Sequence, residues 1–196
     1  MHVSIDPEGV IAMRTWLKWI AVLATVAAIA LVAPSAAQAA PYCGITWGSL
    51  DKSAGDLSGD PLLDVRAGRH GCFDRLVMDF ADADGAAIGY TVRYVDAVRQ
   101  DGSGNVVPLR GGAFLQIDLR APSYDANGNL TYAPTNPREL VNVRGWQTFR
   151  QVASAGSFEG YTTIGLGVRA RLPFRVFTLD GPADGSRVVI DVAHRW

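Results

Sequence analysis

From Leu62 to the C-terminus the chain alternates apolar and polar residues, and no stretch repeats apolar residues at helical spacing for more than about two turns. A period of two is typical of strands that bury one face and expose the other. Leu115, Ile117 and Leu119, for example, are separated by polar residues and predict a half-buried strand. The fold class is therefore predicted to be all-β, with strands within residues 76–80, 90–94, 115–119, 164–168, 174–179 and 188–192.

Clusters of Asp, Asn and Gly separate these expected strands. Such residues reverse the chain because they tolerate positive φ angles. Short strands joined in this way indicate a sandwich of two antiparallel sheets. Two of the clusters resemble calcium loops, but Phe80 and Ser123 occupy the first ligand position, where an acid is required. We therefore interpret the clusters as solvated hairpin loops, at residues 82–85, 101–105, 125–129 and 180–185.

Residues 1–39 have the organisation of a secretory signal peptide, with Met13 as an alternative start. Arg14 and Lys18 supply the positive segment, residues 19–32 are apolar except for one threonine, and residues 37–39 form a small-x-small cleavage pattern. The apolar run is shorter than the roughly 18 residues that a membrane span requires. We therefore predict an exported, extracellular or envelope-associated protein with no membrane span after signal cleavage, and an uncleaved anchor is the alternative.

Both cysteines, Cys43 and Cys72, lie in the part that would be exported, and an even number of cysteines in an oxidising compartment predicts a disulfide. This disulfide would close a loop of about 30 residues and stabilise the fold by roughly 3.5 kcal/mol. It would fasten a weakly structured arm, residues 40–60, to the domain at residues 61–196. No metal site is expected, because the cysteines and histidines show no ligand spacing.

The net charge is close to zero with and without the signal segment. The chain has 18 basic and 19 acidic residues, and residues 1–39 hold two of each, so 16 basic and 17 acidic residues remain. No segment carries a block of like charge. This balance argues against a protein that binds nucleic acid or an anionic membrane by releasing counterions.

Motifs of known catalytic sites are missing or incomplete. Ser49 and Lys52 have the Ser-x-x-Lys spacing, but the Ser-Asp-Asn and Lys-Thr-Gly motifs of penicillin-binding enzymes are absent, as are Gly-x-Ser-x-Gly and a phosphate-binding glycine loop. We therefore predict no enzyme activity and no cofactor. The alternative is a small hydrolase in which His70 or His194 faces a carboxylate and a hydroxyl in a deep pocket.

The order of several segments along residues 61–196 is also informative. Phe-Asp-Arg-Leu-Val at residues 73–77 and Phe-Arg-Val-Phe-Thr-Leu at residues 174–179 contribute most. Taken together, the segments resemble the AMIN-like domain of secreted actinobacterial proteins. The resemblance implies a β-sandwich without catalytic residues, related to AMIN domains that target envelope enzymes and secretins and bind cell-wall material. The other matching segments are residues 71–72, 78–80, 90–95, 101–104, 113–117, 158–160, 173 and 187–192.

We expect a non-enzymatic module that associates with the cell envelope through cell-wall polysaccharide or peptidoglycan, or through an envelope protein. Aromatic rings stack on sugars and arginines pair with carboxylates. An extended segment would place Arg169 and Arg171 on the same side. A further alternative is a carrier of an apolar ligand, for which Gly165 and Gly167 would leave room between the sheets. The candidate binding residues are Arg144, Trp146, Arg150, Tyr161, Arg169 and Arg171.

Overall fold

A computed structural model describes residues 41–81, 87–181 and 184–196 of the chain. The expected signal peptide and the turn cluster at residues 82–85 lie outside the described residues. Within these ranges the regular structure consists of nine strands and one short 3-10 turn. The bounds are η1 Tyr42–Gly44, β1 Lys52–Ala54, β2 Leu62–Arg69, β3 Phe73–Phe80, β4 Gly89–Val95, β5 Ala113–Arg120, β6 Phe149–Phe158, β7 Tyr161–Val168, β8 Phe174–Asp180 and β9 Ser186–Ala193.

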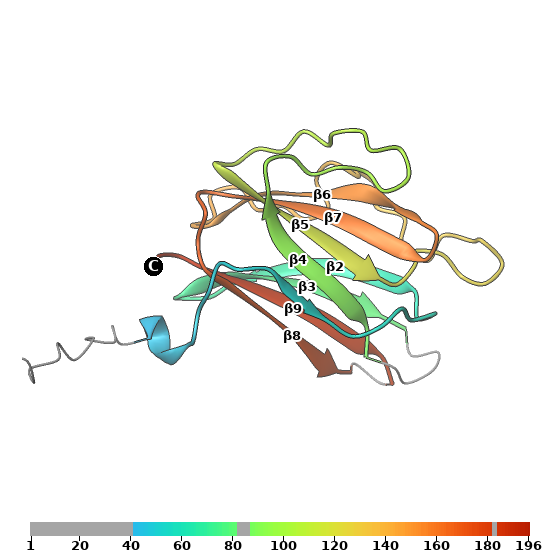
Figure 1. Ribbon diagram of the computed structural model, residues 1–196, viewed down its shortest axis with the longest axis horizontal. Helices are drawn as coiled ribbons and strands as arrows, with labels where there is room; N and C mark the ends of the chain where they lie inside the picture. The colour runs from blue at the N-terminus through green and yellow to red at the C-terminus, as the bar shows by residue number, and fades with distance from the viewer. Residues whose placement is uncertain (1–40, 82–86, 182–183) are drawn as a thin grey trace, which may run out of the picture. The chain divides into compact units, whose positions relative to one another are not determined.

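The strands form two antiparallel sheets that lie face to face (Figure 1). One sheet has five strands in the order β1-β4-β5-β7-β6, and the other has four strands in the order β2-β3-β9-β8. The predicted all-β sandwich is therefore confirmed. In the described part of the chain, no helix has the length and apolar character needed to cross a membrane.

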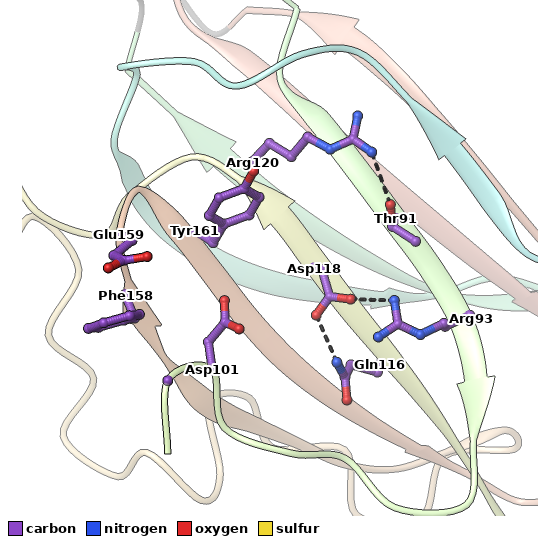
Figure 2. Close-up of a pocket in the computed structure, with 10 residues that line it drawn as sticks. Thr91, Arg93, Asp101, Gln116, Asp118, Arg120, Phe158, Glu159 and Tyr161 are labelled. Carbon is purple, nitrogen blue, oxygen red and sulfur yellow. Dashed lines mark hydrogen bonds and ion pairs between the residues drawn. The ribbon is translucent and has the colours of Figure 1, made fainter. Parts of the chain in front are cut away.

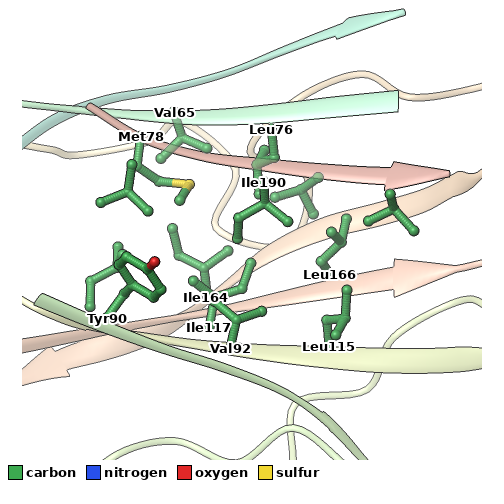
Figure 3. Packing of buried hydrophobic residues seen from close by; sticks show 14 of the residues in the cluster. Val65, Leu76, Met78, Tyr90, Val92, Leu115, Ile117, Ile164, Leu166 and Ile190 are labelled. Carbon is green, nitrogen blue, oxygen red and sulfur yellow. The ribbon is translucent and has the colours of Figure 1, made fainter. Parts of the chain in front are cut away.

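The core lies between the sheets and is built from the inward positions of each strand (Figure 3). Leu76, Met78 and Ile190 come from the four-stranded sheet, and Ile117 and Ile164 face them from the five-stranded sheet. All five side chains have an exposed fraction of at most 1%. Because side chains alternate between the two faces of a strand, burying these positions turns their polar neighbours outward.

The N-terminal arm is more ordered than the sequence indicated. Its strand β1 pairs with β4 at the edge of the five-stranded sheet, and Gly48 bridges Phe174 at the edge of the four-stranded sheet. The predicted disulfide between Cys43 and Cys72 is present, with the two Cα atoms 6.4 Å apart. Besides the disulfide, backbone pairing with both sheets therefore holds the arm to the domain.

The glycines of β7 face outward, which corrects the geometry of the apolar-carrier alternative. A Cβ atom at Gly165 would lie 2.8 Å from Cδ1 of Leu109 and 3.1 Å from Cγ1 of Val98. A Cβ atom at Gly167 would overlap the carbonyl oxygen of Arg110. These glycines therefore let the connection between β4 and β5 lie against the outer face of the sheet, and they leave no space between the sheets.

Candidate functional site

A groove of about 560 Å³, here called the sheet groove, lies on the outer face of the five-stranded sheet (Figure 2). Its floor is formed by outward side chains of β4 and β5. The register pairs Thr91 with Asp118 and Arg93 with Gln116, so these four polar side chains share one face. The inward side chains of these strands, such as Val92 and Ile117, are buried in the core, so the polar side chains between them face outward and form the floor.

Hydrogen bonds hold this floor in place. Nη1 of Arg93 donates to Oδ2 of Asp118 at 2.6 Å, and Nε2 of Gln116 donates to Oδ1 of the same carboxylate at 2.9 Å. The hydroxyl of Thr163 on β7 donates to Oδ1 at 3.2 Å. Three strands therefore orient one carboxylate, and a polar ligand would meet donors and acceptors that are already positioned.

Arg120 closes the groove on the side of the N-terminal arm. Its Nη2 donates to the hydroxyls of Ser53 at 3.0 Å and Thr91 at 3.2 Å, and its Nη1 donates to the carbonyl oxygen of Gly55. These partners are neutral. The guanidinium therefore keeps its full positive charge at the rim of the groove while its position is fixed.

The opposite wall combines aromatic and acidic side chains from the β6–β7 hairpin and the β4–β5 connection. Phe158 and Tyr161 are 48% and 37% exposed, which is high for aromatic residues. Glu159 adopts a left-handed backbone conformation, with φ of 48°, at the tip of the hairpin. Within the described residues, the carboxylates of Asp101 and Glu159 have no hydrogen-bonding partner. The wall thus offers an apolar ring surface beside free hydrogen-bond acceptors.

Three of the predicted binding residues meet in a second hollow, here called the arginine pocket. Arg144, Trp146 and Arg150 line it together with Arg110, which the sequence did not single out. The pocket has a volume of about 510 Å³ and lies where the β5–β6 connection enters β6. Tyr161 belongs to the sheet groove instead, so the predicted residues divide between two sites.

The last two candidates have different surroundings. Residues 169–171 form a bend between β7 and β8, so the segment is not extended and does not align its arginines on one side. Nη2 of Arg169 donates to the carbonyl oxygen of His194 at 2.6 Å. Arg171 lies 4.7 Å from the centre of the Tyr94 ring, and its Nη2 donates to the carbonyl oxygen of Ser49 at 3.3 Å. All three contacts are made with groups of the protein itself, and neither arginine lines the sheet groove or the arginine pocket.

The two histidines do not line either site. His194 is buried, and its Nδ1 lies 2.8 Å from the hydroxyl of Thr148, while its Nε2 donates to the carbonyl oxygen of His70 at 2.9 Å. The carboxylate of Asp74 accepts the backbone N–H groups of Thr148 and Phe149 at 2.7 and 2.9 Å. These hydrogen bonds connect the start of β6 to β3 and to the C-terminal segment.

Sequence reasoning missed most of the groove. The alternation in β4 and β5 carried the relevant signal, because Thr91, Arg93, Gln116 and Asp118 occupy the polar positions of predicted strands. The sequence pattern did not show that these two strands are neighbours in the sheet. Pairing of β4 with β5, and of β5 with β7, turns separate polar positions into one surface.

The fold and these surface hollows define a disulfide-linked β-sandwich module with two polar hollows outside its core. Residues 60–194, more than half of the chain, match the model of the AMIN-like domain, and the chain belongs to this family. The family and the disulfide fit an exported or envelope-associated protein. No curated protein and no solved structure matches the chain.

Proposed function

We propose that the chain is a non-enzymatic module of the cell envelope that binds a wall polysaccharide in the sheet groove. The single observation that carries this proposal is the exposed ring of Tyr161 beside a fixed polar floor formed by Arg93, Gln116 and Asp118. Sugars present apolar ring faces and hydroxyl groups at the same time. A site that combines an aromatic ring with prearranged donors and acceptors satisfies both.

The groove suits a polymer better than a small metabolite. It is open to solvent on the outer face of a sheet, so part of a longer chain could lie in it while the rest stays in solvent. Its groups carry both signs of charge, with Arg93 and Arg120 opposite Asp101 and Glu159. A neutral or mixed-charge glycan is therefore a better match than a polyanion.

The histidine network supports the non-catalytic part of the proposal. A general base requires a ring nitrogen that can reach a substrate. His194 and the Thr148 hydroxyl that its Nδ1 faces are instead buried, with exposed fractions of 3% and 0%, and its Nε2 donates to the backbone of His70. We therefore assign this histidine network to the stability of the fold and not to catalysis.

Co-sedimentation with purified, protein-free cell wall tests the proposal. The wild-type protein is expected to sediment with the wall above a salt-washed control. Tyr161→Ala should weaken binding about three- to tenfold, because it removes the ring on which a sugar stacks. Tyr161→Phe keeps the ring and should retain most of the binding. Leu130→Ala is the matched control, since it removes another exposed apolar side chain outside the groove.

Two outcomes would contradict the proposal. Absence of sedimentation by the wild-type protein would remove the polymer as a ligand. Sedimentation only with wall that retains its proteins would indicate an envelope protein as the partner instead.

A further inference from the structure

The arginine pocket has an excess of positive charge in a chain that is nearly neutral overall. Arg110, Arg144 and Arg150 line it, and the guanidinium of Arg69 lies 5.9 Å from the centre of the Trp146 ring in its wall. The two carboxylates that face this region are Glu139 on the surface and the buried Asp74 beneath the backbone of Phe149. Four guanidiniums against two carboxylates leave a local excess of positive charge.

Protein contacts fix two of the guanidiniums. Arg110 binds Glu139 through two hydrogen bonds, of 2.5 and 3.1 Å, and also donates to the carbonyl oxygen of Arg150 at 3.1 Å. Nη1 of Arg150 donates to the carbonyl oxygens of Trp146 and Phe149, both at 2.9 Å. The bonds of Arg150 go to neutral carbonyl oxygens, so its charge is held in position without being neutralised.

Arg144 and the indole of Trp146 supply the hydrogen-bond donors of the pocket that remain available to a ligand. Arg144 is exposed, and among the described residues its guanidinium has no hydrogen-bonding partner. The indole N–H of Trp146 likewise has none, whereas the indoles of Trp47 and Trp196 donate to backbone carbonyl oxygens. The pocket therefore holds a guanidinium and an indole N–H that are both available to a ligand, beside fixed positive charge.

The charge of Arg144 already acts on its surroundings. The hydrogen bond from Arg110 is the main reason that the pKa of Glu139 lies below its usual value, and the positive charges of Arg110 and Arg144 lower this pKa further. A neighbouring carboxylate thus stays ionised more readily here than in water. An external oxyanion would gain from the same field.

We infer that the arginine pocket is a binding site for an oxyanion, a carboxylate or a phosphate group, held by Arg144 and Arg150 against Trp146. This site goes beyond the sugar-binding role proposed for the sheet groove, and it lies in a different part of the molecule. Guanidinium groups bind both anions with charge-assisted hydrogen bonds, often two at a time. The neutral carbonyl partners of Arg150 keep its guanidinium ready for this contact.

The experiment follows the Trp146 indole N–H resonance while the purified protein is titrated with inorganic phosphate, glucuronate or glucose. Phosphate and glucuronate are expected to shift this resonance with saturation, and glucose is not. The stronger of the two anions identifies the source of the charge: a phosphate group or a sugar carboxylate. Arg144→Gln should weaken anion binding roughly tenfold, since it removes a charged donor.

Arg138→Gln is the matched control. Arg138 belongs to the same connection and is exposed, but it does not line the pocket, so its substitution removes the same charge and should leave the affinity within about twofold. The inference would be overturned if neither anion shifted the Trp146 resonance, if glucose shifted it as much as glucuronate, or if Arg138→Gln weakened binding as much as Arg144→Gln. None of these results depends on sedimentation with cell wall, so the two proposals fail separately.

Discussion

Nη1 of Arg93 on β4 lies 2.6 Å from Oδ2 of Asp118 on β5, on the outer face of the five-stranded sheet. The pair is partly exposed, with 35% of the arginine side chain and 22% of the aspartate side chain accessible to solvent. An ion pair so exposed contributes little to stability. It does fix the orientation of the polar groups on the floor of the sheet groove, which matters for binding.

Asp118→Asn therefore separates binding from stability. The amide keeps the size of the side chain but removes the charge that orients Arg93, so binding to purified wall should fall several-fold. The free energy of unfolding should fall by less than about 1 kcal/mol. Sedimentation and urea denaturation measure the two effects. Asp51→Asn, at an exposed position of the arm, should change neither quantity, and a large loss of stability in Asp118→Asn would contradict this interpretation of the pair.

Replacing Cys43 and Cys72 by serine should lower the free energy of unfolding by about 3.5 kcal/mol. The disulfide spans 29 positions, and removing it restores the conformational freedom of that loop in the unfolded chain. Urea denaturation with and without reductant gives the value. Because β1 also pairs with β4, the arm should stay attached at low temperature and become sensitive to protease only near the unfolding transition. Immediate cleavage of the arm on reduction would show that the backbone pairing is too weak to hold it.

Gly167→Ala should destabilise the fold by about 1–3 kcal/mol. Its new methyl group would meet the backbone of Arg110, which cannot move aside as a flexible side chain could. Thermal denaturation compares it with Gly71→Ala, where no heavy atom lies within 4 Å of the new Cβ atom. An unchanged stability of Gly167→Ala would mean that the connection between β4 and β5 does not lie against the sheet.

Tyr94 should make the fold sensitive to alkaline pH. Burial, the largest cause, raises the pKa of Tyr94 from 10.0 to about 12, although its hydrogen bond to the carbonyl oxygen of Leu172 and the nearby charge of Arg171 act in the opposite direction. Above pH 10 the unfolded chain therefore loses this proton first, and stability falls as the pH rises toward 12. Below pH 10 the contribution is fully present.

Comparison with Tyr94→Phe isolates this effect. The variant loses the hydrogen bonds between the Tyr94 hydroxyl and the backbone of Leu172, at a cost of about 1 kcal/mol at neutral pH. Its stability should then decline less steeply between pH 10 and 12 than that of the wild type. Urea denaturation across this range provides the measurement, and equal slopes for the two proteins would contradict the assignment.

The regular alternation of the chain was enough to predict the sandwich and the core of most strands. It did not predict the three-residue β1, and it also failed for β2 and β6. Both strands contain register shifts, between Leu62 and Asp64 in β2 and twice within β6. A bulge inserts a residue and breaks the period of two, so the pattern on which the prediction rests is lost.

The residues of the candidate sites could also be predicted only in part. Arg144, Trp146 and Arg150 were predicted together because they are close in sequence, and they do share a pocket. Arg110 was missed because it reaches the pocket from another connection, where its backbone N–H donates to the side chain of Gln151 at 2.7 Å. Contacts between distant segments depend on strand order, which alternation alone does not determine.

The most direct measurement for the central claim is an amide chemical-shift map of the protein in the presence of solubilised wall polysaccharide. We expect the perturbed amides to cluster around Gln116, Asp118 and Tyr161, and we expect Tyr161→Ala to need about three- to tenfold more polysaccharide for the same perturbation. Perturbations confined to the outer face of the four-stranded sheet, around Arg66 and Arg175, or no perturbation at saturating polysaccharide, would contradict the assignment of the sheet groove as the binding site.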